Sequence, residues 1–362
     1  MSLTIGQVLS GARWGYCITE PLTGDGSHAA LVYKARVSPG STTSVNEQDM
    51  PEWAVIKCPS PLRAQRDFTR LDLKREWEAY QHPSIANSPY IRKLYDLIGN
   101  PEDFDDKTGE TRPCLALEWM DMTLQDLTPK LDKRAYKLIV AIIEAVMESI
   151  LCFSEAKVVD TDTKPGNFLL SNIDTDHPTV KIGDLGLVLP CTHPRTNVQP
   201  LPMRAPEVFL GFPCTTKSQV WSCAASLLFW LKPSLLGSSS DDGDGLRGSC
   251  IDVLPTPWCL AKLRRLFPAW RDRPVAGDVR RKAEWALSED HLEELPAPLK
   301  RIGCLEEEMG RLGMVRELRG VMGLMLVTDP KERFGPREVL ASGEMRALRE
   351  VVSTGGMDLD EE

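Results

Sequence analysis

The feature that most constrains this chain is a polar loop at residues 159–167. It places Asp162, Lys164 and Asn167 within six positions, and Asp184 follows after two short apolar runs. Phosphoryl transfer needs such a set: a carboxylate to orient a hydroxyl, a cation for the moving phosphoryl group and oxygen ligands for magnesium. The two apolar runs predict a short hairpin, which would bring both candidate metal ligands to one edge.

Turn-forming residues alone could explain such a loop, because Asp, Pro, Gly and Asn all favour turns. The second motif, Asp-Leu-Gly at 184–186, argues for chemistry instead. Together they resemble the catalytic loop (His-x-Asp-x-Lys-Pro-x-Asn) and metal-binding loop (Asp-Phe-Gly) of eukaryotic-type protein kinases. The resemblance implies that Asp162 orients the substrate hydroxyl, that Lys164 contacts the γ-phosphate, and that Asn167 and Asp184 bind magnesium. It also implies an α+β fold, a bilobal protein-kinase-like fold with a small β-rich N-lobe and a larger helical C-lobe.

A second set of residues resembles the ATP-binding strand of the same family. Ala54-Val55-Ile56-Lys57 is similar to the Val-Ala-Ile-Lys strand. The resemblance implies that Lys57 holds the α- and β-phosphates of ATP and pairs with a glutamate of the following helix. Glu76 is the preferred partner. Glu78 is the competing candidate, but its side chain would point about 200° away on that helix.

The phosphate loop departs from the family pattern. Gly24 and Gly26 precede a Val-Tyr-Lys-Ala strand that begins at Val32, but the third glycine is missing. Ala29 or Ala30 would stand in for it, and backbone amides can cradle phosphate without every glycine. An alternative frame at residues 10–15 fits less well, because no such strand follows it.

Two scaffold elements agree with the resemblance. Glu118 to Met120 would form the hinge that offers backbone groups to adenine, with Leu117 gating the back of the pocket. Glu207, in an Ala-Pro-Glu motif, would form a buried ion pair with Arg333. Breaking such a pair should cost about 3–5 kcal/mol.

Three positions differ from the family pattern around the catalytic loop. Asp160 replaces a His, Gln219 replaces an Asp that accepts hydrogen bonds from the loop, and Thr161 replaces an Arg that reads an activating phosphate. The first two departures are hypothesised to be one co-adapted change. The loop is similar to that of SR-protein kinases within the CMGC group, and the chain resembles divergent protein-kinase-like proteins of filamentous fungi. The short activation segment, 184–207, predicts constitutive order.

The order of the elements predicts the organisation of the chain. Residues 1–117 would form the N-lobe, 118–123 the hinge, 124–352 the C-lobe and 353–362 an acidic disordered tail, with a flexible insert at 237–248. The apolar patterns predict strands at 30–33, 53–56 and 115–120, and helices at 64–81, 135–153, 218–230, 294–308 and 315–327.

The composition limits the classes of partner and the cellular locations that are expected. A net charge of −9 argues against a non-specific nucleic-acid binder and is compatible with basic protein substrates. The longest apolar stretch, Cys223–Leu231, is too short to span a bilayer, so no membrane association is expected. Ten scattered cysteines and an N-terminus without a signal-peptide pattern predict a cytoplasmic or nuclear protein. A monomer is expected.

Three functions compete on these grounds. The first is a Ser/Thr protein kinase that uses ATP and Mg2+, with protein substrates. The second is a catalytically weak or inactive pseudokinase that acts as a scaffold or regulator, suggested by Asp160, Gln219 and the incomplete glycine loop. The third is a small-molecule kinase, which the Ala-Pro-Glu motif and its Arg333 partner disfavour.

Overall fold

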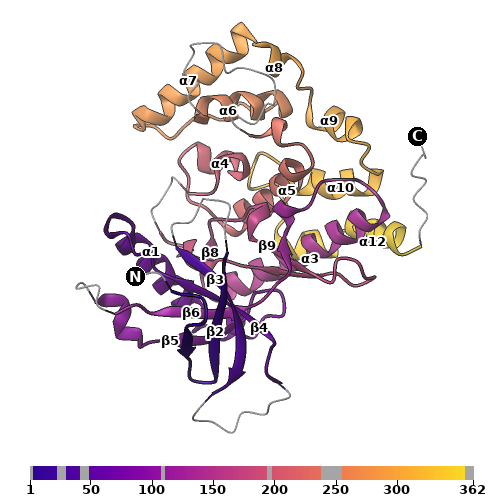
Figure 1. Cartoon of the computed structure of the whole chain (residues 1–362). Coiled ribbons are helices and arrows are strands. Elements are labelled where there is room, and N and C mark those ends of the chain that lie inside the picture. The colour runs from indigo at the N-terminus through magenta and orange to yellow at the C-terminus, as the bar shows by residue number, and fades with distance from the viewer. Residues whose placement is uncertain are drawn as a thin grey trace. The chain divides into compact units, whose positions relative to one another are not determined.

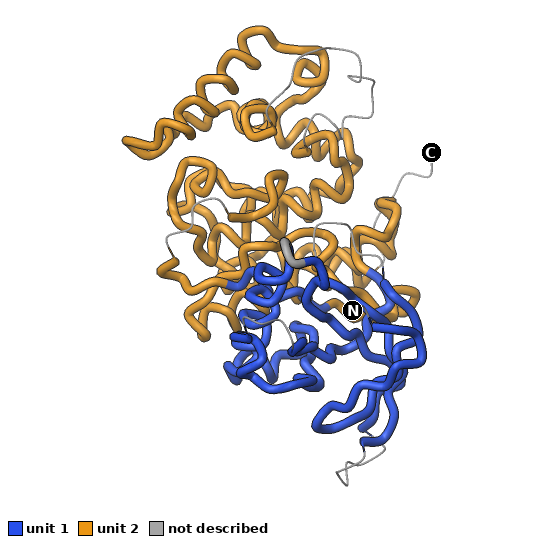
Figure 2. Tube along the Cα trace, turned by 60° about the vertical axis from the view of Figure 1, so that its left-hand side comes forward, with its two compact units in different colours: residues 1–122, 181–188 blue, residues 123–180, 189–362 orange. Residues whose placement is uncertain are grey.

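The computed structural model describes residues 3–22, 30–40, 49–106, 111–193, 198–237 and 255–354 of the 362-residue chain. The chain folds as two compact units (Figure 2): Met1–Met122 with Lys181–Val188, and Thr123–Val180 with Leu189–Glu362. The division between residues 122 and 123 falls at the end of the predicted hinge. The first unit is rich in strands and the second in helices, which confirms the α+β class.

The first unit is built on one six-stranded antiparallel sheet with the order β1-β2-β3-β4-β6-β5 (Figure 1). Neighbouring strands of this sheet follow one another in the chain, apart from the central β4–β6 pairing. The strands are β1 (Val8–Ser10), β2 (Trp14–Leu22), β3 (Leu31–Pro39), β4 (Trp53–Cys58), β5 (Leu94–Ile98) and β6 (Cys114–Glu118).

The core of this sheet comes from alternate residues of its strands. Tyr16, Ile18, Tyr33, Ile56 and Ala116 are all buried and belong to one hydrophobic cluster. Because side chains of a strand alternate between faces, this cluster fixes the register of the sheet. The helix α1 (Arg63–Ala79) follows β4, and the unit also holds α2 (Pro83–Ala86), η2 (Pro101–Asp105) and η5 (Leu185–Leu187).

The second unit is built around two long helices. The helix α3 (Lys133–Glu155) begins at Asp132, whose side chain accepts a hydrogen bond from the Ala135 N–H. The helix α5 (Thr216–Leu231) begins at Thr215 in a capping box with Ser218 and is buried along most of its length. Such a helix, buried on nearly all sides, suits the centre of a helical unit.

Further elements complete the second unit. They are β8 (Val158–Asp160), β9 (Phe168–Ser171), η3 (Leu124–Asp126), η4 (Pro165–Asn167), η6 (Leu201–Met203), η7 (Pro233–Leu235), α4 (Pro206–Phe209), α6 (Pro255–Leu266), α7 (Val279–Glu294), α8 (Ala297–Lys300), α9 (Leu305–Arg311), α10 (Arg316–Met325), α11 (Pro336–Ala341) and α12 (Gly343–Thr354). The strands β7 (Met122–Thr123), β10 (Thr179–Ile182) and β11 (Val188–Pro190) lie at the points where the chain passes from one unit to the other.

Most predicted elements are confirmed within a few residues, and one is wrong. The helix expected at 294–308 is divided into the end of α7, α8 and α9. Leu295 adopts a left-handed backbone conformation (φ 43°), and Pro296 follows it without an N–H to donate, so α7 cannot continue. The helix α12 extends to Thr354, and the rest of the predicted tail lies outside the described residues. The insert at 237–248 lies outside the described residues apart from Gly237.

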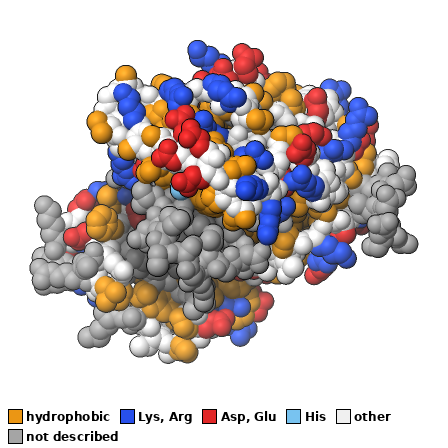
Figure 3. Space-filling view, turned by 90° about the horizontal axis from the view of Figure 1, so that it is seen from above, with side chains coloured by type: hydrophobic (Ala, Val, Ile, Leu, Met, Phe, Trp, Pro, Cys, Tyr) orange, Lys and Arg blue, Asp and Glu red, His pale blue; other side chains and the backbone are white. Residues whose placement is uncertain are grey.

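The surface of the chain carries charges of both signs. Basic and acidic side chains intermingle on the face seen in Figure 3, and neither sign covers it continuously. Within the described residues, no helix is both long enough and apolar enough to cross a membrane.

Candidate active site

Lys57, the predicted ATP-anchoring residue, is the centre of a charged cluster in the first unit. It lies near the end of β4, where it pairs with Val32 of β3 and Leu115 of β6. Its Nζ lies 2.8 Å from Glu76 Oε2 and 2.7 Å from Asp184 Oδ1. Glu76 is fully buried on α1, so the structure brings this glutamate to the lysine across nineteen positions.

The two carboxylates of the Lys57 cluster stabilise the charged form of the lysine. Burial alone would lower the pKa of Lys57, but the carboxylates of Asp184 and Glu76 outweigh it and raise that pKa above its ordinary value. The lysine is therefore held as a cation at neutral pH. A buried cation between two carboxylates is a suitable anchor for phosphate oxygens, which carry negative charge.

The Asp184 loop is shaped by its backbone. Asp184 adopts a left-handed conformation (φ 57°, ψ 78°), which Asp tolerates better than most residues. The Leu185 N–H donates to Glu76 Oε1 (3.4 Å) and the Gly186 N–H to Asp184 Oδ1 (3.3 Å). A Cβ at Gly186 would lie 3.2 Å from Asp184 Oδ1, so glycine suits this tight turn.

Leu117 and Glu118 are the last two residues of β6, and the predicted hinge begins there. Leu117 is fully buried and Met120 is buried, while Glu118 is held by hydrogen bonds. The Glu118 carboxylate accepts two contacts of 2.7 Å from Lys181 Nζ and a hydrogen bond of 3.0 Å from the Lys93 N–H. The sequence did not indicate that Lys181 would hold the Glu118 carboxylate. The only signal for such a contact was a charged residue inside an apolar strand.

The phosphate loop is described only at its ends. Val32 lies in β3 and pairs with Leu22 at the end of β2, so residues 23–29 connect two paired strands. The predicted loop residues Gly24 and Gly26 lie outside the described residues. The alternative frame at residues 10–15 forms the turn between β1 and β2, where Gly15 pairs with Ser10.

The predicted catalytic loop lies in the second unit, between β8 and β9. Asn167 Nδ2 donates to the Asp162 carbonyl (2.8 Å) and to Asp162 Oδ2 (3.0 Å), and Lys164 Nζ lies 3.2 Å from the same carboxylate oxygen. Asp162 and Asn167 are buried. The structure therefore brings the three predicted loop residues together with the Asp162 carboxylate held from two sides.

The donor set fits magnesium. Asn167 uses its amide nitrogen for the loop, so its side-chain oxygen is the atom that could meet a metal. Asp184 supplies a second oxygen ligand, and magnesium in phosphoryl-transfer sites takes few protein oxygens beside phosphate and water. Among the described residues there is no cluster of three or more His, Cys, Asp or Glu residues that would hold a metal by itself. Asn167 and Asp184 belong to separate units, so their shared site stays a prediction.

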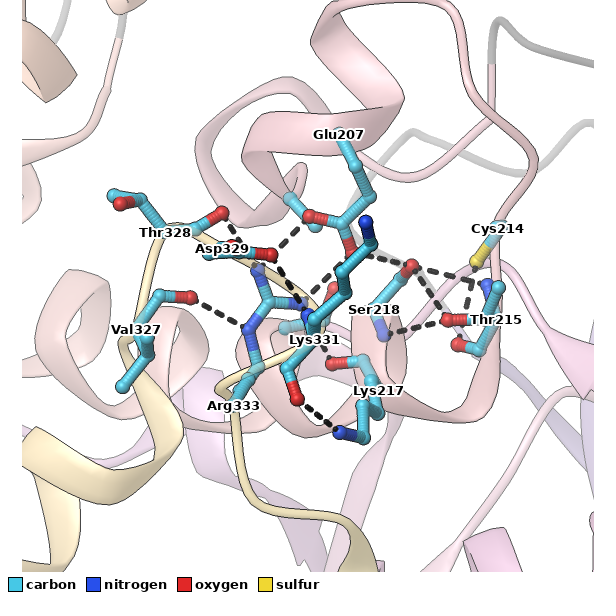
Figure 4. A network of polar contacts seen from close by, with 12 residues as sticks. Glu207, Cys214, Thr215, Lys217, Ser218, Val327, Thr328, Asp329, Lys331 and Arg333 are labelled. Carbon is cyan, nitrogen blue, oxygen red and sulfur yellow. Dashed lines mark hydrogen bonds and ion pairs between the residues drawn. The ribbon is translucent and has the colours of Figure 1, made fainter. Parts of the chain in front are cut away.

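The Glu207–Arg333 pair predicted from sequence is present in the second unit (Figure 4). Arg333 Nη1 and Nη2 lie 2.8 and 2.9 Å from the two Glu207 carboxylate oxygens, which is a bidentate geometry. Ser218 Oγ also donates to Glu207 (2.6 Å), and the guanidinium lies 5.1 Å from the Trp221 ring. The pair joins α4 to the segment before α11.

The departures around the loop have different surroundings. The Asp160 carboxylate accepts the Asp162 N–H and the Thr163 hydroxyl, both at 2.9 Å. Gln219 is fully buried on α5, and its Oε1 and Nε2 have no hydrogen-bond partner among the described residues. Asp160 therefore supports the catalytic loop, whereas the Gln219 side chain makes none of the hydrogen bonds that an Asp at position 219 is expected to make.

Gln199 is a structural residue that sequence reasoning missed. Its amide Nε2 donates to Ser222 Oγ (2.8 Å), and its Oε1 accepts the Ala205 N–H (3.0 Å). Its own N–H donates to the Thr161 carbonyl (3.1 Å), and its φ is 68°. A buried Gln with a left-handed backbone thus fixes the end of the activation segment to the catalytic loop. No sequence motif pointed to this residue.

Comparison with known proteins shows the family. The family model described as protein kinase domain matches residues 38–343, and the chain belongs to this family. The dual specificity protein kinase YAK1 of Saccharomyces cerevisiae is 31% identical over 198 residues, 51% of this chain and 24% of that protein. Homeodomain-interacting protein kinase 2 of Mus musculus is 26% identical over 302 residues, 77% of this chain and 24% of that protein.

The fold is also that of a kinase. The crystal structure of the PF14_0431 kinase domain matches with a TM-score of 0.63 at 15% identity, covering 95% of this chain and 98% of that one. This likeness confirms the bilobal α+β kinase fold. The chain spans about a quarter of the length of the curated relatives named above.

Proposed function

We propose that this chain is an active Ser/Thr protein kinase that transfers the γ-phosphoryl group of Mg-ATP to protein hydroxyls. The observation that carries the proposal is the cluster of Lys57, Glu76 and Asp184, in which the buried lysine lies 2.7–2.8 Å from the two carboxylates. An unused lysine would not be expected to be buried between two carboxylates, because desolvation of three charges is costly.

The proposed roles follow from the two sets of contacts. Lys57, held by Glu76, binds the α- and β-phosphates, and Asp184 and Asn167 supply oxygen ligands for Mg2+. Bound magnesium neutralises charge on the transferred phosphoryl group. Asp162 orients the attacking hydroxyl, since its carboxylate is fixed by two neighbours, and Lys164 steadies the γ-phosphate.

Purified protein, radiolabelled Mg-ATP and a basic generic protein substrate test the proposal. Lys57→Met and Asp184→Asn are each expected to lower labelling by about 100-fold or more, because both remove a charge that acts on the phosphates. Lys74→Met is the matched control. Lys74 lies in the same unit, on the surface of α1, and pairs with Asp105 at 2.7 Å, so its loss should leave labelling unchanged.

A pseudokinase that acts as scaffold or regulator is the second candidate. The buried, unpartnered amide of Gln219 favours it, since catalytic loops depend on satisfied support. A parent protein that labels no substrate, and whose Lys57→Met variant behaves identically in every binding assay, would favour this candidate over the first.

The oligomeric state, cellular location and substrate preference of the enzyme are part of the proposal. We propose a monomer in the cytoplasm or nucleus that acts on basic protein substrates, because the net charge is −9 and the described cysteines are all free thiols. Peptide arrays that compare basic with acidic flanking residues test the substrate preference, and cell fractionation tests the location.

A further inference from the structure

Arg92 is a cation of the first unit that no sequence motif assigns. Its backbone is fixed on both sides: its N–H donates to the Ile182 carbonyl (2.9 Å), and its carbonyl accepts the Tyr80 hydroxyl (2.6 Å). Its side-chain Nε donates to the Glu118 carbonyl at 2.8 Å. The direction of the side chain is therefore set by a rigid backbone at one end and by the predicted hinge at the other.

The guanidinium of Arg92 keeps spare donors. A guanidinium carries five N–H groups, and only its Nε–H is bonded to any described residue. Arg92 also forms no ion pair within 4 Å among the described residues, although it is half-buried. The remaining N–H groups are thus available to something else that enters this region.

The charges around Arg92 are those of the nucleotide cluster. Burial lowers the pKa of Arg92, while Tyr80, Glu76, Asp184 and Glu118 act in the opposite direction. Two of these groups, Glu76 and Asp184, are the carboxylates that hold Lys57. Arg92 therefore shares one electrostatic environment with the ATP-anchoring lysine, and it remains a cation at neutral pH.

Glu118 is committed at every polar group. Its carbonyl accepts from Arg92, its N–H donates to the Lys93 carbonyl (2.9 Å), and its carboxylate is held by Lys181. The hinge carbonyl that should accept the adenine amine thus already carries a cationic donor. An adenine amine that approached this oxygen would meet the positive charge of the guanidinium and would be blocked by its volume.

We propose that Arg92 is a specificity-determining residue of the nucleotide pocket, whose guanidinium occupies the adenine acceptor at Glu118 and must be displaced when an adenine nucleotide binds. This inference rests on the proposed function, because only a chain that binds ATP would bring adenine to the predicted hinge at Glu118. Losing a hydrogen bond to a charged donor reduces affinity by about 10- to 100-fold. A side chain without the donor should recover that factor.

Calorimetric titration of the full chain with Mg-ATP and with Mg-tripolyphosphate tests the inference. Arg92→Met is expected to tighten Mg-ATP binding by about 10- to 100-fold and to leave Mg-tripolyphosphate, which has no base, no tighter than in the parent. Lys93→Met, which removes the neighbouring exposed cation, is the matched control and should change neither affinity. If Arg92→Met does not fold, Arg92→Gln keeps a neutral donor and should give an intermediate gain.

The outcomes separate this inference from the proposed function. Equal or weaker Mg-ATP binding in Arg92→Met, or equal tightening of both ligands, would overturn the role of Arg92 while a parent that transfers phosphate keeps the kinase proposal. Tighter Mg-ATP binding with no transfer by either protein would support the role of Arg92 and overturn the kinase proposal. If neither protein binds Mg-ATP, both are overturned.

Discussion

The buried pair of Glu207 and Arg333 gives the sharpest stability prediction. Arg333→Met keeps most of the side-chain volume and removes the guanidinium, whose exposed fraction is 0%. Glu207 is then left as a buried carboxylate with one close remaining donor, the Ser218 hydroxyl. The change also removes the guanidinium donors from three carbonyls, those of Val327, Lys217 and Thr328, at 2.8, 2.9 and 3.5 Å.

The expected loss follows from these contacts. Removing one partner of a buried ion pair costs about 3–5 kcal/mol, because the other charge stays buried without compensation. That is a large fraction of the roughly 5–15 kcal/mol by which domains are stable. Replacing both partners, as in Glu207→Leu with Arg333→Met, should cost less than the sum of the two single changes, since no charge is left unpaired.

Urea denaturation followed by far-ultraviolet circular dichroism measures the effect. Arg333→Met is expected to lower the midpoint by about 1–2 M, from the usual dependence of stability on urea. Arg280→Met is the matched control, because Arg280 is 73% exposed and pairs with Glu284 one turn away, so its loss should cost about 0.5 kcal/mol or less. An Arg333→Met loss below about 1 kcal/mol would refute the reasoning from burial.

Three further predictions concern pH and the catalytic loop. Burial alone would raise the pKa of Glu308, but the Gly303 N–H, Lys232 and Arg311 outweigh it and hold that pKa below its ordinary value. A carboxyl group whose pKa is lower in the folded than in the unfolded state stabilises the fold above the unfolded pKa, and this stabilisation is lost as the pH falls. Glu308→Gln should therefore flatten the fall in unfolding free energy below about pH 4.5. Asp160→Asn should lower kcat by about 10-fold with little change in KM for ATP, because a neutral amide holds the Asp162 N–H less strongly; a pure KM effect would contradict this. Phosphatase treatment should leave activity unchanged, because Thr161 replaces the phosphate-reading Arg; a strong loss would contradict constitutive order.

Local pattern was sufficient for much of this fold. The strands around Lys57 and Leu117 and the helix that carries Glu76 follow from short runs of β-branched residues and from helical spacing. The pairing of Glu207 with Arg333 also followed from motif order. The helix predicted at 294–308 is interrupted at Leu295, because Pro296 follows it and cannot donate a backbone hydrogen bond.

Contacts that depend on position in space were not readable in the same way. Arg92, Lys181 and Gln199 stand in no motif, and each donates a hydrogen bond to a residue distant in the sequence, which is Glu118 for the first two and Ser222 for Gln199. A hydrogen bond forms only when folding brings donor and acceptor within about 3 Å at a suitable angle, and local periodicity carries no such information.

The sequence by itself determined the family, the order of the elements and the residue types suited to phosphoryl transfer, because these depend on motifs and on local periodicity. Only the tertiary structure decided that Glu76 and Asp184 both meet Lys57, that Asp160 supports the catalytic loop while Gln219 has no partner, and that Arg92 lies on the Glu118 carbonyl. The physical reason is that the free energy of a buried charge is set by the groups that folding brings around it.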